Sequence, residues 1–219
     1  MNLWKIMAVI AVVAAALLLA SPGCENGGSG GGRRGAGNFP VVIIETSAGT
    51  IRAELWPDKA PKTVENFLHY VDSGFYDGTV FHRCIRGFMV QGGGFTADGK
   101  KKVTIRPPVI NEADSGLSNI CGTLSMARTD EPHSATSQFF INTVDNPRLD
   151  HAGKTDRDWG YCVFGQVLSG MDVAYAIEEA PTIGNERQGR PAKPVVIRSI
   201  RRVGAPRRKE PAAKPAAKE

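Results

Sequence analysis

The apolar positions of the chain change their period from one segment to the next. Residues 39–58 contain two apolar, β-branched runs separated by Ser-Ala-Gly at 47–49, which predicts an antiparallel hairpin. Pro61 suits the first turn of a helix that follows, and Gly74 suits its C-terminal cap. Between them, apolar residues at i, i+3, i+4 and i+7 predict one buried helical stripe, formed by Val64, Phe67, Leu68 and Val71.

A second helix is expected shortly after residue 169. Ser169 and Asp172 have the spacing of a capping box, and Pro181 marks a stop. Val173 and Ile177 would share the apolar face of this helix.

Short apolar runs punctuated by Gly or Pro make up most of the remaining pattern. Residues 96–118 have no strong period and are expected to be mostly loop. Many strands with only two helices predict a mainly β fold, either a closed barrel or a sandwich, capped at its ends by the helices. The strand candidates are residues 79–82, 88–91, 122–127, 138–142, 161–167 and 195–200.

The first 23 residues fit an export signal, because Lys5 precedes an uninterrupted apolar run over residues 6–20. That run is short for a membrane span. The Ser-Pro-Gly-Cys sequence ending at Cys24 resembles the cleavage and acylation site of bacterial lipoproteins. We therefore expect a membrane-anchored lipoprotein of the cell envelope, in the periplasm, held through lipid on Cys24. Two alternatives stay open: cleavage without lipid, giving a soluble periplasmic or secreted protein, and an uncleaved anchor.

Composition separates one globular region, residues 39–203, from two polar ends. Residues 24–38 carry Cys24 and a Gly-rich stretch that predicts a flexible tether, and residues 204–219 predict a disordered basic tail. Seven of the 27 Lys and Arg residues and two of the 22 acids lie in 201–219, which leaves 20 of each elsewhere. We therefore expect no nucleic-acid partner, and a tail that either contacts anionic surfaces or is simply solvated.

The chemistry-bearing residues gather in three clusters, at 81–95, 122–128 and 134–146. If 81–83 and 88–91 are strands, alternation could place Arg83 and Gln91 on one face among aromatic and thioether side chains. A guanidinium beside an apolar pocket can hydrogen-bond a peptide carbonyl or nitrogen. No nucleophile elbow, carboxylate pair, zinc-ligand spacing or disulfide framework is present, so we expect neither a metal nor covalent catalysis.

This pattern predicts a peptide-binding face with one electrostatic group. The alternative is that the aromatic side chains of the clusters simply form barrel core. Consecutive residues of a strand point to opposite faces of the sheet. We therefore expect one of Phe139 and Phe140 to be a core residue.

The segments FHRCIRGFMVQGG, SMAR and SQFFIN, preceded by PKTVENF, resemble the signature segments of the cyclophilins, in order and at suitable distances. The resemblance covers residues 41–200, and GTLSMAR and GYCVFGQV look like the compact bacterial members. It implies a closed eight-stranded antiparallel β-barrel capped by two α-helices. It also implies a peptidyl-prolyl cis-trans isomerase, or rotamase, that acts on proline-containing polypeptides as a monomer and needs no cofactor.

The resemblance also implies roles for individual residues, with Arg83 matching the catalytic arginine. Arg148 and Tyr161 depart from many eukaryotic members, which have tryptophan and histidine there. The residues expected around the proline ring are Phe88, Met89, Gln91, Phe140 and Leu149. Further substrate contacts are expected at Ala127, Arg128, Gln138 and Tyr161. A rival hypothesis is a binding module that holds proline-containing segments as a chaperone, with isomerisation incidental.

Overall fold

The computed structural model describes residues 39–183 and 189–204. The predicted export signal, Cys24 and tether lie outside the described residues, as do residues 205–219 of the predicted tail. No helix of the described ranges is long and apolar enough to cross a membrane.

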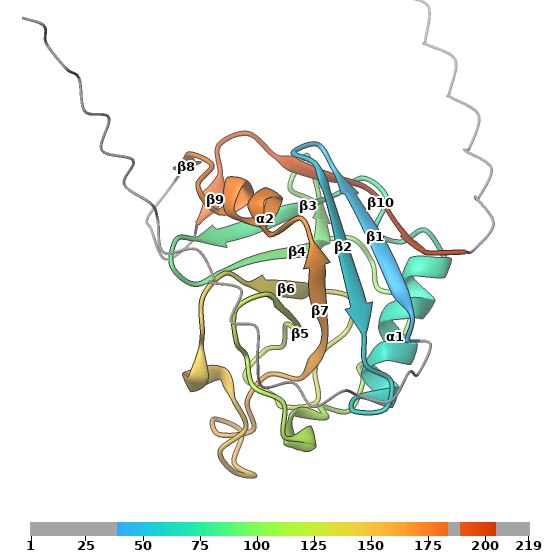
Figure 1. Cartoon of the computed structure of the whole chain (residues 1–219), viewed down its shortest axis with the longest axis vertical. Coiled ribbons are helices and arrows are strands. Elements are labelled where there is room, and N and C mark those ends of the chain that lie inside the picture. Colours follow the sequence, from blue (N-terminus) through green and yellow to red (C-terminus); the bar gives the residue numbers. More distant parts are fainter. Residues whose placement is uncertain (1–38, 184–188, 205–219) are drawn as a thin grey trace, which may run out of the picture.

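Eight antiparallel strands form a closed barrel, and a separate two-stranded sheet joins β8 (Thr182–Ile183) to β9 (Arg190–Pro191) (Figure 1). Each barrel strand is hydrogen-bonded to two neighbours, so the barrel has no open edge. Around the barrel the strands are β1 (Val41–Thr46), β10 (Val195–Arg202), β3 (Thr79–Ile85), β4 (Met89–Thr96), β6 (Phe139–Asn142), β5 (Thr123–Met126), β7 (Val163–Ser169) and β2 (Thr50–Leu55). The predicted barrel and all six additional strand candidates are confirmed, with ends that differ by a few residues.

The opening hairpin follows directly from its apolar pattern. β1 pairs with β2 so that Ile44 lies opposite Ile51, and the side chains of both are fully buried. Alternate residues of β2 face solvent, as expected for a strand with one buried face. The predicted hairpin is confirmed.

The helix α1 (Pro61–Asp72) packs at one end of the barrel, apart from α2 (Met171–Glu178) (Figure 1). All four residues of its predicted stripe are buried. Phe67 stands at the centre of an aromatic cluster, with ring centroids 5.4 Å from Tyr76, 5.5 Å from Phe139 and 5.0 Å from Phe164. The core is therefore built where α1 meets the inner faces of the strands.

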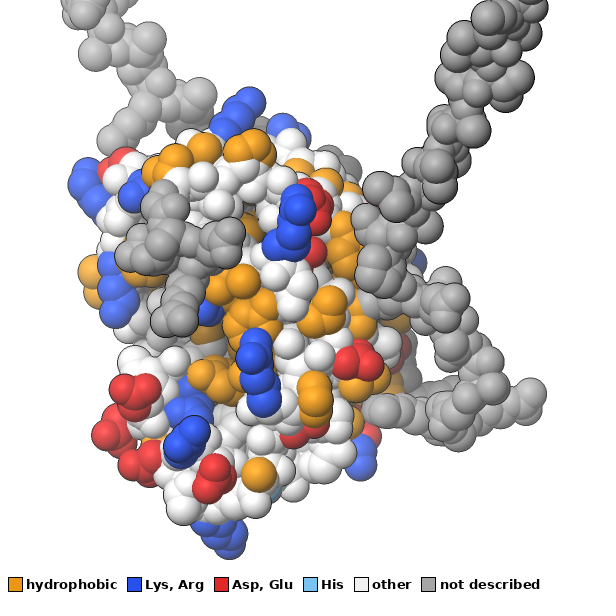
Figure 2. Space-filling model, turned by 90° about the vertical axis from the view of Figure 1, so that its left-hand side faces the viewer, with side chains coloured by type: hydrophobic (Ala, Val, Ile, Leu, Met, Phe, Trp, Pro, Cys, Tyr) orange, Lys and Arg blue, Asp and Glu red, His pale blue; other side chains and the backbone are white. Residues whose placement is uncertain are grey.

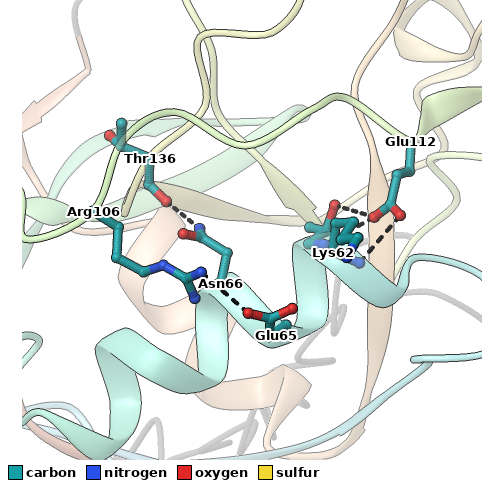
Figure 3. Close-up of polar contacts among 7 residues, drawn as sticks. Lys62, Glu65, Asn66, Arg106, Glu112 and Thr136 are labelled. Carbon is teal, nitrogen blue, oxygen red and sulfur yellow. Dashed lines mark hydrogen bonds and ion pairs between the residues drawn. The ribbon is translucent and has the colours of Figure 1, made fainter.

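The N-terminus of α1 is capped by a residue from the loop over residues 96–118. Ala60, at the N-cap position, provides no side-chain hydrogen bond. The Glu112 carboxylate accepts hydrogen bonds from the backbone nitrogens of Lys62, at 3.1 Å, and Thr63, at 2.8 Å (Figure 3). A negative charge at a helix N-terminus is also favoured by the helix dipole. Residues 96–118 are mostly loop, as predicted, with one short 3₁₀ turn, η1 (Ala113–Ser115).

The predicted capping box of the second helix is wrong. α2 begins at Met171 after Gly170, which has a φ of 93°, and no side chain caps it. Ser169 is the last residue of β7 and pairs with Arg52, so its backbone is part of the sheet. Glycine adopts this left-handed backbone at little cost, which lets a strand turn directly into a helix.

Candidate functional site

A β-bulge in β3 directs Arg83 to the outside of the barrel. Phe81 pairs with Gly92 and Arg83 pairs with Gln91, so β3 has one extra residue, His82, between two consecutive pairs. In a regular strand, Phe81 and Arg83 would share a face. With the bulge, Phe81 is fully buried in the core while Arg83 is partly exposed.

Two amide side chains continue from Arg83 across the outer face. Arg83 Nη1 donates a long hydrogen bond to Gln91 Oε1, at 3.5 Å, and Gln91 Nε2 donates to Gln138 Oε1, at 3.0 Å. Gly94 leaves the space that Gln138 occupies, since a Cβ there would lie 2.5 Å from Gln138 Cγ. The remaining guanidinium donors of Arg83 have no hydrogen-bond or ion-pair partner within the described ranges. They are therefore available to a ligand.

The predicted apolar residues lie beside this polar row. Phe140 pairs with Gln91 across β6 and β4 and packs edge-on against Tyr161, with ring centroids 5.7 Å apart. Met89 and Phe140 are only 2% and 3% exposed, so they form the floor, whereas Phe88 is partly exposed at the rim. Leu149, in the 3₁₀ turn η2 (Pro147–Leu149), accepts a hydrogen bond from the Tyr161 backbone nitrogen at 2.8 Å.

Phe139 faces the opposite way from Phe140 and belongs to the hydrophobic core cluster, which does not include Phe140. The expectation that one of this pair is core and the other is not is therefore confirmed.

Arg128 connects the loops around Tyr161. Its guanidinium donates to the carbonyl oxygens of Gly160, at 2.9 Å, and Asp156, at 3.0 Å, and lies 4.9 Å from the centre of the Tyr161 ring. It also donates to the carbonyls of Thr129 and Asp130. Through these four hydrogen bonds and the ring contact, Arg128 holds the loops and the Tyr161 ring in place.

A surface hollow of about 420 Å³ adjoins the row of Arg83 and Gln91. Besides residues from 101–104 and 129–136, it is lined by Gln91, Ala127, Arg128 and Gln138. The backbone nitrogen of Ala127 donates to the Gln138 carbonyl at 3.0 Å, so that N–H is already used within the barrel. Four residues predicted as substrate contacts thus line one hollow. The other predicted contacts are called the apolar patch below, and two of them, Phe140 and Tyr161, are in ring contact. They are Phe88, Met89, Phe140, Leu149 and Tyr161.

Sequence reasoning missed the buried amides that hold this patch. Asn119, 1% exposed, donates to the Leu149 carbonyl at 3.1 Å and accepts from Ser125 Oγ at 2.7 Å. Asn146, 4% exposed, donates to the Phe88 carbonyl at 2.9 Å. The Asn-Pro dipeptide at 146–147 is a turn signal that could have pointed to Asn146. Asn119 has no comparable signal, because its partners are distant in sequence.

The neighbouring titratable groups leave Arg83 as the charged group of the row. Burial, assisted by the positive charge of Arg83, lowers the pKa of His82 to about 4, so this imidazole is neutral at pH 7. Burial likewise raises the pKa of Cys84 and of Cys162 to about 12, and both thiols are free. Neither is a thiolate nucleophile at neutral pH.

No group of three metal-ligating side chains occurs in the part of the chain that the structure describes.

A guanidinium and two amides lie beside apolar side chains on the outer face of a closed barrel, an arrangement suited to contacting a peptide. Residues 41–202 match the family model of cyclophilin type peptidyl-prolyl cis-trans isomerases. The chain belongs to this family.

Individual relatives agree with the family match. Peptidyl-prolyl cis-trans isomerase A of Dickeya dadantii is 56% identical over 161 residues, covering 73% of this chain and 83% of the relative. Isomerase cyp18 of Streptomyces antibioticus is 56% identical over 75% of this chain and 99% of its own length. A solved cyclophilin-type isomerase of Cryptosporidium parvum superposes with a TM-score of 0.62 at 28% identity, covering 77% of this chain and 99% of that one. The chain is therefore an isomerase that acts on proline-containing polypeptides.

Proposed function

We propose that Arg83 is the group that accelerates X-Pro isomerisation, while the apolar patch holds the proline ring. The observation that carries this proposal is the position of Arg83. Its unpartnered donors lie beside Gln91, and its guanidinium carbon is 6.0 Å from the centre of the Phe88 ring. A charged donor is thus next to the surface on which a proline ring would pack.

The uncatalysed barrier arises from amide resonance and amounts to about 18–20 kcal/mol. Rotation about the C–N bond removes this conjugation and makes the imide nitrogen pyramidal and basic. A guanidinium that donates to that nitrogen stabilises the twisted state more than either planar isomer, which is the condition for catalysis. The guanidinium of Arg83 offers several donors. No bond is broken.

The remaining residues would position the substrate. Met89 and Phe140 would contact the proline ring from below and Phe88 from the rim. Gln91 and Gln138 would accept or donate hydrogen bonds to the peptide on either side. We propose that the substrates are exported proteins and that one chain suffices, because all these residues come from a single barrel.

The test of this function is an NMR exchange measurement on an X-Pro peptide. Uncatalysed cis-trans exchange takes tens to hundreds of seconds. We expect catalytic amounts of the protein to make the exchange much faster. Binding of the peptide without faster exchange would instead support the chaperone hypothesis.

We further propose that lipid on Cys24 anchors the protein to a membrane of the cell envelope. The support is the sequence alone: an apolar run at 6–20, small residues before Cys24, and a Gly-rich stretch after it. Cys24→Ser should move the full-length protein from the membrane fraction to the soluble fraction while its isomerase activity is unchanged, because the barrel is formed by later residues. Cell fractionation with detergent extraction measures this. Equal partition of both forms would exclude the lipid anchor.

A further inference from the structure

Two guanidinium groups flank the ring of Phe88 at the rim of the site. The Cζ atom of Arg148 lies 4.9 Å from the ring centre, and that of Arg83 lies 6.0 Å from it. Arg83 comes from β3, whereas Arg148 lies in the η2 turn after β6. On the side of the molecule that carries the β3–β4 turn, Figure 2 shows Lys and Arg side chains beside exposed apolar ones near the middle of the face.

The backbone that carries Arg148 is held from both sides. Asn146 donates to the Phe88 carbonyl at 2.9 Å, and Asn119 donates to the Leu149 carbonyl at 3.1 Å. Pro147 restricts the chain further, because its ring fixes φ. The Arg148 side chain itself is exposed. A charged group on such a fixed base loses less entropy when it binds a partner than one on a loose loop.

No carboxylate of the described ranges forms an ion pair with Arg83 or Arg148. The acids nearest along the chain to Arg148 have other contacts: Asp145 accepts from the Cys121 backbone nitrogen at 2.8 Å, and Asp150 from that of Asn119 at 2.6 Å. Glu179 pairs with Arg86.

The adjoining hollow strengthens this charge imbalance. Its lining includes three cationic residues and no carboxylate: Lys101, Lys102 and Arg128. Lys102 and Arg128 direct their donors to backbone carbonyls of the protein. Arg83, Arg148 and Lys101 have no carboxylate partner within the described ranges, and a bound peptide can supply one.

We propose that Arg148 is a specificity-determining residue that favours substrates with an acidic side chain close to the proline. Because both guanidinium carbons lie within 6.0 Å of the Phe88 ring centre, they are separated by no more than the length of about three extended residues. With Arg83 at the imide bond, a Glu or Asp within three residues of the proline can reach Arg148. The planar fork of Arg148 can then bind both carboxylate oxygens.

The experiment compares peptides that carry one Glu or one Gln at each of three positions on either side of the proline. This inference rests on the proposed function, which the Gln peptides test independently by showing exchange or none. For the natural protein we expect kcat/KM to be about three- to fivefold higher for Glu than for Gln at the best position, as for a well-placed exposed ion pair. The advantage should shrink toward one in 1 M salt.

Variants identify the residue responsible. Arg148→Gln should bring the Glu to Gln ratio to about one, and Arg148→Glu should favour Lys peptides over Glu peptides. Arg52→Gln is the matched control, since it removes an exposed cation from β2, opposite β4 in the barrel, and should leave the ratio unchanged. Two results would overturn the inference. One is an active protein whose kcat/KM is no higher for Glu than for Gln peptides at any position. The other is a Glu advantage that persists in Arg148→Gln.

Discussion

Arg83→Ala should lower kcat/KM for an X-Pro peptide by about 10²-fold or more, which corresponds to roughly 3 kcal/mol of transition-state stabilisation. The reason is that the donor acts only on the twisted imide, so peptide affinity should change less than the rate. Arg83→Lys should recover activity in part, because an ammonium is a point charge without the guanidinium fork. NMR exchange at several peptide concentrations measures both quantities.

Arg86→Ala is the matched control for this prediction. Arg86 lies three residues further along the chain, is exposed, and pairs with Glu179 at the surface. Its removal also deletes one positive charge near the site but no donor beside Gln91. We expect less than about a twofold change, as surface ion pairs contribute little. If Arg83→Ala, shown by circular dichroism to be folded, isomerises as fast as the parent, the assignment of Arg83 is wrong.

Asn119→Ala should destabilise the protein by about 3–5 kcal/mol and also impair the site. The side chain of Asn119 accepts from Ser125 Oγ at 2.7 Å and donates to the carbonyls of Leu149, at 3.1 Å, and Tyr161, at 3.3 Å. Alanine leaves these buried groups without their partner. Urea unfolding measures the loss of stability, and kcat/KM at low temperature measures the effect on the patch.

Asn66→Ala provides the comparison for Asn119→Ala. Asn66 is similarly buried, at 2% exposure, but its side chain makes one hydrogen bond, to the Thr136 carbonyl at 2.6 Å (Figure 3). We expect a loss of about 1–2 kcal/mol for this variant. If the two variants lose equal stability, the amide of Asn119 does not act as a hub.

Local patterns were sufficient to predict α1 and the opening hairpin. The stripe of α1 repeats over two turns, and the hairpin has two β-branched runs around a glycine, so neighbouring residues carry the information. The start of α2 was predicted to within two residues, but its cap was predicted wrongly. β7 extends through Ser169, which pairs with Arg52, a partner more than a hundred residues earlier. Pairing between distant strands leaves no local trace at Ser169.

The residues of the site could be predicted from the sequence, but the geometry that brings them together could not. Arg83 and Gln91 were expected on one face, and they pair directly. Simple alternation, however, places Arg83 on the same face as the core residue Phe81, and only the bulge at His82 separates the two. The support from Asn119 depends on partners 6 to 42 residues away, so no periodic pattern could reveal it.

The closure of the barrel has a consequence for how the chain folds. β1 pairs with β10, so that Val42 lies opposite Arg202, and the first strand gains its second neighbour only when the last one is in place. Contacts between residues so far apart in sequence give the domain a high contact order, which is associated with slow folding. The β10 side of β1 therefore stays unpaired until the last strand of the domain is in place. Until then that edge is open to pairing with other chains.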